Sequence, residues 1–238
     1  MTEPKLTHGE PIDWLQHQWV IAGVVASAAR FAPIPFFDDA IRTQCRRFVV
    51  SRTLAASDTS LTTASLKPLY GESGGLVARS LRAIAKAPLK LLLFPVRKIA
   101  LMATSIHGVP MEIMKTVLLG RTLRRQLSSG QIDPGRAEAM RSAFEEAFAR
   151  MDFHALRAGI SDSLRGVRSW KKSAITMARS LSRHSLAPGE AMPADDRIEL
   201  TASRVQQVLD RPETTKLFAE FDRRFDQAYA GRLATPPR

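Results

Sequence analysis

A long apolar run near the start of the chain predicts a helix that folds back on itself. Residues 14–37 carry a single charged side chain, Arg30, over 24 positions. Pro33 disfavours helical backbone at the residue before it, so we expect the helix to end near Phe31. The acidic pair Asp38–Asp39 and a new helical period follow directly, as in the first turn of a second helix. The pattern therefore predicts an apolar helical hairpin with Pro-x-Pro at its apex.

The sequence leaves open whether protein or lipid covers this hairpin. Its helical part, residues 14–31, has 18 residues, about 27 Å at 1.5 Å per residue. A bilayer span needs about 20 apolar residues, so a re-entrant or interfacial hairpin is favoured over a spanning helix. The alternative is the central helix of a helical domain. The residues assigned to the apolar hairpin are Trp19, Val24, Pro33, Pro35, Phe36 and Phe37.

Helical spacing of apolar residues recurs along the chain, whereas the alternation typical of strands is almost absent. The pattern therefore predicts an all-α protein built as a multi-helix bundle. Asp133 and Pro134 mark one helix start, because a carboxylate caps free N–H groups and proline suits the first turn. The further helices are expected at residues 37–54, 76–87, 109–127, 134–181 with bends at Gly159 and Gly166, 196–209 and 212–230.

These elements suggest a division of the chain into regions. A flexible tail, 1–11, precedes the hairpin and a basic helical region, 12–130. A long helical segment, 131–186, is followed by a linker rich in Pro and Gly, 187–194. A C-terminal helical pair and tail complete the chain at 195–238.

Positive charge is concentrated in the middle of the chain. Residues 61–130 carry eleven basic and two acidic side chains, a net charge of +9 within the chain's +12. Six of the basic residues accompany a proline-interrupted apolar stretch, a pattern typical of membrane surfaces. The first four fall within about 80° of arc on a helix, although an ordinary solvated face would show the same stripe. The six are Arg79, Arg82, Lys86, Lys90, Arg97 and Lys98.

No catalytic constellation accompanies this charge. Gly71 to Gly75 matches G-x-S-x-G around Ser73, but no strand precedes it, so we interpret it as a flexible turn. The Asp38–Asp39 pair could hold a metal, yet a favourable contact with the positive helix end explains it more simply. The five histidines never fall at ligand spacing, and the single cysteine, Cys45, excludes a disulfide framework. We expect no enzyme activity, no metal and no cofactor.

We do not expect the basic region to bind nucleic acid. Residues 61–130 contain only Tyr70 and Phe94 as aromatic side chains, too few for a base-stacking platform. Three arginines, Arg121, Arg124 and Arg125, could contact phosphates or could interact with the negative end of their helix.

The order of an Ala-rich helix, Ala32-Pro33-Ile34-Pro35, an acidic pair and a basic helix resembles the Pro-x-Pro hairpin of bacterial EcsC-like proteins. It is also similar to the helical membrane-associated domain appended to some bacterial GTPases. The segment Phe94-Pro95-Val96-Arg97-Lys98-Ile99 is similar to a stretch in uncharacterised bacterial proteins. The resemblance covers residues 14–127 and implies membrane association. It assigns no catalytic residue to this sequence.

These observations together predict a non-catalytic, membrane-associated scaffold or adaptor on the cytoplasmic face of a bacterial inner membrane, peripheral or re-entrant. Its partner would be anionic lipid or a membrane protein, and self-association stays open. The N-terminus lacks the basic region of a signal peptide. The alternatives are a soluble helical module that binds a protein or nucleic acid, and a hydrolase that uses Ser73.

Overall fold

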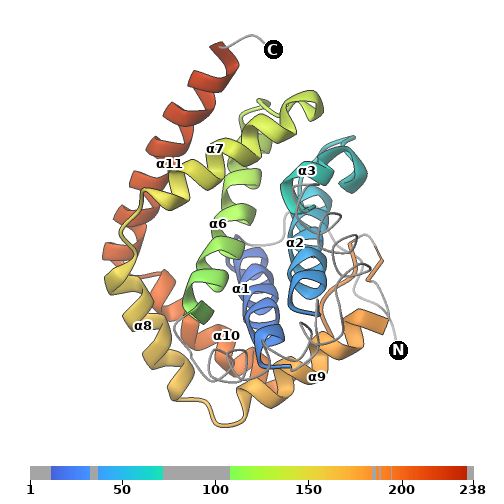
Figure 1. Ribbon diagram of the computed structural model, residues 1–238, viewed down its shortest axis with the longest axis vertical. Coiled ribbons are helices and arrows are strands. Elements are labelled where there is room, and N and C mark those ends of the chain that lie inside the picture. The colour runs from blue at the N-terminus through green and yellow to red at the C-terminus, as the bar shows by residue number, and fades with distance from the viewer. Residues whose placement is uncertain are drawn as a thin grey trace, which may run out of the picture.

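The computed structural model describes residues 12–32, 37–71, 108–183, 186–187, 189–193 and 195–234. Within these ranges the regular structure is helical and contains no strand, which confirms the all-α multi-helix bundle (Figure 1). The elements are α1 (Ile12–Ala28), η1 (Ala29–Phe31), α2 (Phe37–Ala55), η2 (Thr63–Leu66), α3 (Lys67–Tyr70), α6 (Val109–Ser128), η5 (Pro134–Arg136), α7 (Ala137–Ala149), α8 (His154–Arg165), α9 (Trp170–Arg183), α10 (Asp196–Leu209) and α11 (Pro212–Ala234).

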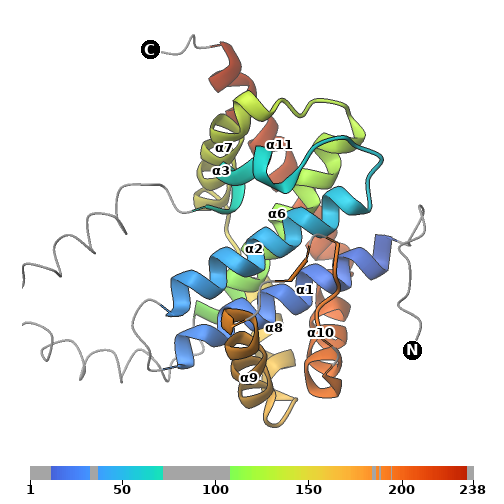
Figure 2. The ribbon, with the colours of Figure 1, turned by 90° about the vertical axis from the view of Figure 1, so that its right-hand side faces the viewer.

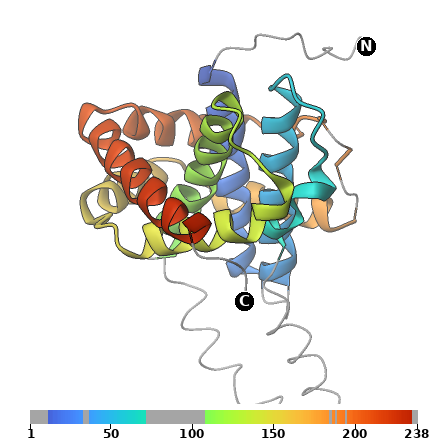
Figure 3. The ribbon, with the colours of Figure 1, turned by 90° about the horizontal axis from the view of Figure 1, so that it is seen from above.

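Helix α1 is the centre of the bundle. It packs against α2, α6, α9 and α10, and Figure 3 shows it between α2 and α6. The absence of a side chain at Gly23 allows close approach, because a Cβ there would lie 2.9 Å from the Cα of Ile113 on α6. This burial of an almost uncharged run stabilises the fold by about 1.5–3 kcal/mol for each large apolar side chain.

Protein therefore surrounds the residues of the apolar run that the structure describes. Trp19 and Val24 are 2% and 0% exposed, and Phe37, at the start of α2, is 9% exposed. In the structure these three residues lie in the protein core, the arrangement that the central-helix alternative predicts, and association of the hairpin with a membrane stays a prediction. The hairpin itself is present, since α1 and α2 pack on each other. Pro33, Pro35 and Phe36 lie outside the described residues.

The segment expected as one long helix or a broken pair, 134–181, is divided into four elements. Asp133 caps the first, with its Oδ1 accepting from the Gly135 amide at 2.8 Å. A break after α8 begins at Gly166, as predicted, and includes Ser169 with a φ of 64°. Gly159 is instead inside α8, where a Cβ would lie 3.0 Å from Cγ1 of Val208 on α10. This glycine serves close helix packing rather than a bend.

The C-terminal helices join the same core as the N-terminal hairpin. α10 packs against α1 and α8, and α11 packs along α7, as the upper left of Figure 1 shows. Phe221 and Phe225 of α11 are fully buried, and Phe221 meets Phe144 of α7 with ring centroids 5.4 Å apart. In the part of the chain that is described, no helix combines the length and apolarity needed to cross a membrane.

Candidate anionic-ligand surface at the hairpin end

One side of the molecule gathers the ends of several elements, and we call it the hairpin end. It comprises η1 and the starts of α2 and α6, toward the left of Figure 2. The described chain stops at Gly71 and resumes at Gly108. Ser73 and all six predicted basic residues, Arg79 to Lys98, fall between them and therefore lie outside the described residues.

A network of ion pairs joins α2 to α6 at this end. Glu112 of α6 accepts from Arg46 at 2.8 Å and lies 3.6 Å from Arg42. Arg42 also pairs with Asp38 one turn earlier at 2.6 Å and with Asp39 at 3.9 Å. Burial raises the pKa of the Asp38 carboxyl, while Arg42 and Arg30 act in the opposite direction. The acidic pair is thus engaged by an arginine of its own helix.

The described residues offer little for metal or nucleophilic chemistry. They contain no group of three or more His, Cys, Asp or Glu side chains placed to hold a metal ion. Cys45 is fully buried, and burial raises the pKa of its thiol, so the reactive thiolate is disfavoured.

Helix α9 carries a basic face that sequence reasoning missed. Its sequence, WKKSAITMARSLSR, contains no acidic residue, and four cations fall within about 120° of arc at 100° per residue. These cations are Lys171, Lys172, Arg179 and Arg183. The opposite side is buried in the core through Trp170, Ala174, Met177, Ala178 and Leu181. The signal was available, because the apolar period of this segment was recognised and the cations lie between its members.

The basic face of α9 differs from the paired arginines of α6, α7 and α11 by its lack of carboxylate partners among the described residues. Arg121 and Arg125 on α6 pair with Asp222 and Asp226 of α11 at 2.7–2.8 Å, and similar pairs occur on α7 and α11. Within the ranges resolved here, Lys172, Arg179 and Arg183 are exposed and have no ion pair. The charge of α9 is therefore available to an external anion.

The start of α9 contacts the hairpin end directly. The ring of Trp170 meets that of Phe31 edge-on, with centroids 6.2 Å apart. The Lys171 ammonium lies 4.5 Å from the centroid of the same Phe31 ring, within cation–π range. The basic face and the hairpin end are therefore parts of one continuous surface.

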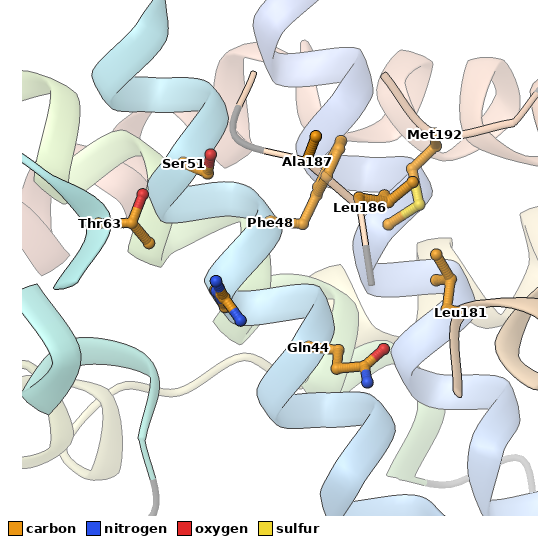
Figure 4. A pocket seen from close by; sticks show the side chains of 9 residues that line it. Gln44, Phe48, Ser51, Thr63, Leu181, Leu186, Ala187 and Met192 are labelled. Carbon is orange, nitrogen blue, oxygen red and sulfur yellow. The ribbon is translucent and has the colours of Figure 1, made fainter. Parts of the chain in front are cut away.

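A groove between α2 and the second half of α9 adjoins this surface (Figure 4). It is shallow and partly open to solvent, with a cavity volume of about 30 Å³. Apolar side chains line it, among them Phe48 of α2, Leu181 of α9, and Leu186 and Met192 of the following segment. Arg47, an exposed residue, contributes a cation. The basic face thus borders a small apolar depression.

Comparison with protein families, with curated proteins and with solved structures finds no match for this chain.

Proposed function

We propose that this protein is a non-catalytic helical scaffold or adaptor that attaches peripherally to an anionic membrane surface. The attachment uses the basic face of α9 together with the basic segment 72–107. The observation that carries the proposal is the charge of α9, which forms no ion pair with the described residues and lies beside the hairpin end, where α6 begins directly after that segment. The resemblance to EcsC-like and GTPase-appended domains supports the same function.

The physical basis of attachment is electrostatic rather than hydrophobic. The apolar run of α1 is committed to the protein core, so it contributes no apolar area to lipid in this conformation. Each basic residue close to an anionic leaflet contributes about 1 kcal/mol, and this attraction decays over about 8 Å at physiological ionic strength. Binding should therefore require anionic lipid and should weaken as salt is raised.

The test is sedimentation of the full chain with vesicles of phosphatidylcholine that contain phosphatidylserine. Changing Lys172, Arg179 and Arg183 to Gln removes three charges, worth about 3 kcal/mol if all face lipid, so we expect at least a tenfold loss of affinity. A second variant changes Arg79, Arg82, Lys86 and Lys90 to Gln and tests segment 72–107 separately. Vesicles of phosphatidylcholine alone should bind neither variant nor the parent.

A charge-matched control separates the position of the charges from their number. Arg165, Arg211 and Lys216 are exposed residues on α8 and around the start of α11, and their change to Gln removes the same three charges. This control should bind vesicles like the parent. Equal losses in the control and the α9 variant would show an effect of net charge only. Retention of full binding by both α9 and segment variants would contradict the proposal.

A further inference from the structure

A polar cleft lies between the loop that follows α2 and the end of α6. It has a volume of about 520 Å³ and is open to solvent. Its polar lining includes Ser57, Asp58, Thr59, Ser60, Arg124 and Ser128. We infer that this cleft binds the phosphate group of a soluble small molecule, with Arg124 as the cation that recognises it.

Arg124 is set apart from its neighbours on α6. Arg121 pairs with Asp222 at 2.8 Å, and Arg125 pairs with Asp226 at 2.7 Å. In the described ranges Arg124 has no carboxylate partner, and its Nη1 is buried without any protein acceptor. A guanidinium donor withdrawn from solvent is costly unless it meets an acceptor, and phosphate oxygens match its planar fork.

The end of α6 does not use the Arg124 guanidinium as a cap. The carbonyls of residues 124–127 each accept a hydrogen bond from a serine hydroxyl or from the amides that follow the helix, at 3.0–3.1 Å. Three of the four carbonyls that the helix end leaves open, those of residues 125–127, are therefore satisfied locally. The Arg124 side chain, which lines the cleft, is therefore not engaged by the end of its own helix.

The loop after α2 contributes neutral donors to the same cleft. The Thr59 Oγ1 accepts from the Leu61 amide at 3.2 Å, which leaves its own O–H to donate. Ser60 is exposed and lines the cleft as well. The cleft has one carboxylate, Asp58, which forms no ion pair with Arg124 in the described structure. Arg124 and the hydroxyl groups would favour the binding of an anion in the cleft, and the carboxylate of Asp58 would oppose it.

The position of the cleft favours a soluble ligand over a lipid headgroup. The 20 residues of α6 start at the hairpin end and reach the cleft with their last turn, a length of about 30 Å. The end of α2 and the end of α6 accordingly lie on the side away from the hairpin end in Figure 2. A bilayer that contacts the hairpin end would leave this cleft in solvent. The inference is thus independent of the membrane proposal.

The experiment is a titration of the ¹⁵N-labelled full chain with inorganic phosphate and with phenyl phosphate, followed by amide chemical shifts. We expect saturable shifts in residues 57–61 and 128–132. Arg124→Gln should weaken binding at least tenfold, since a charge-assisted contact is lost, and Asp58→Asn should strengthen it several-fold by removing a like charge. Arg211→Gln, at an exposed site elsewhere, should leave the affinity unchanged.

Two results would overturn the inference. One is the absence of saturable shifts up to about 10 mM phosphate, as expected if the cleft holds ordered water only. The other is equal phosphate affinity in Arg124→Gln and in the parent. The Arg124→Gln and Asp58→Asn variants are first checked for a melting temperature equal to that of the parent. A further arm uses phosphatidylcholine vesicles that contain phosphatidic acid. Binding to them that depends on Arg124, without binding of soluble phosphates, would assign the site to lipid and contradict the soluble source.

Discussion

At the residue scale, the packing of α1 depends on the absence of a side chain at position 120. A Cβ at Gly120 would collide with the indole of Trp19, whose Nε1 donates to Oγ1 of Thr53 at 3.1 Å. Three helices meet around this tryptophan. The apolar run predicted a buried or membrane-facing Trp19 without distinguishing the two, because the partner glycine lies about a hundred residues away in the sequence.

A glycine pair tests this packing. Alanine at Gly120 has the better helix propensity, but its methyl group would displace the Trp19 ring, so we expect Gly120→Ala to destabilise the fold by about 1–3 kcal/mol. Gly231 lies near the end of α11, and a Cβ there would meet no atom within 4 Å. Gly231→Ala should be neutral or stabilising by up to about 1 kcal/mol. Urea unfolding measures both, and equal effects would contradict the packing described.

The Glu220 carboxylate gives a residue-scale prediction for pH. Hydrogen bonds from Arg223 and Arg224 lower its pKa from 4.5 to about 2. Because the folded state depresses this pKa, the stabilisation is present above pH 4.5 and is lost as the pH falls toward 2. Glu220→Gln should therefore lose less stability than the parent between pH 4.5 and 2. Thermal melting across this range measures the difference, and parallel pH profiles would contradict the prediction.

At the element scale, helix positions followed from the sequence more readily than helix breaks and faces. The start of α10 at Asp196 and that of α11 at Pro212 agree with the predicted helices, because carboxylates and proline mark first turns by local chemistry. The break between α7 and α8 was not foreseen, since apolar residues continue through Met151 and Phe153. The basic face of α9 was not predicted, because one must know which cations lack carboxylate partners. Those partners come from other helices, so the sequence of α9 alone does not reveal them.

The ion pairs between helices give an element-scale prediction. Glu112 and Glu145 both contact a basic side chain, at 2.8 and 2.6 Å, but their side chains are 9% and 43% exposed. Removal of Glu112 leaves the half-buried Arg46 without a carboxylate partner, so Glu112→Ala should cost about 3 kcal/mol. Glu145→Ala should cost no more than about 1 kcal/mol, because its pair is screened by water. Chemical denaturation would contradict this account if the two variants lost equal stability.

At the scale of the whole molecule, two kinds of surface are separated. Burial of the nearly uncharged α1 places apolar residues inside. Beside the hairpin end, α9 presents cations that form no ion pair with the described residues. The sequence predicted the fold class and suggested membrane association. It favoured an interfacial hairpin over a spanning helix because 18 residues are few for a bilayer span, but length alone does not separate an interfacial segment from a central helix. Six predicted site residues, Arg79 to Lys98, lie outside the described chain, so the predicted stripe stays a prediction.

The most direct measurement asks whether Trp19 enters the bilayer when the protein is bound to membranes. With Trp14→Phe and Trp170→Phe, Trp19 is the one remaining tryptophan, and phosphatidylserine-containing vesicles with brominated acyl chains quench indoles within the hydrocarbon. Sedimentation of the same sample establishes that the variant is bound. The account predicts binding with Trp19 fluorescence unquenched, because the indole stays between α1, α2 and α6. Strong quenching of Trp19 in the bound state would contradict it and would show that the hairpin leaves the core for lipid.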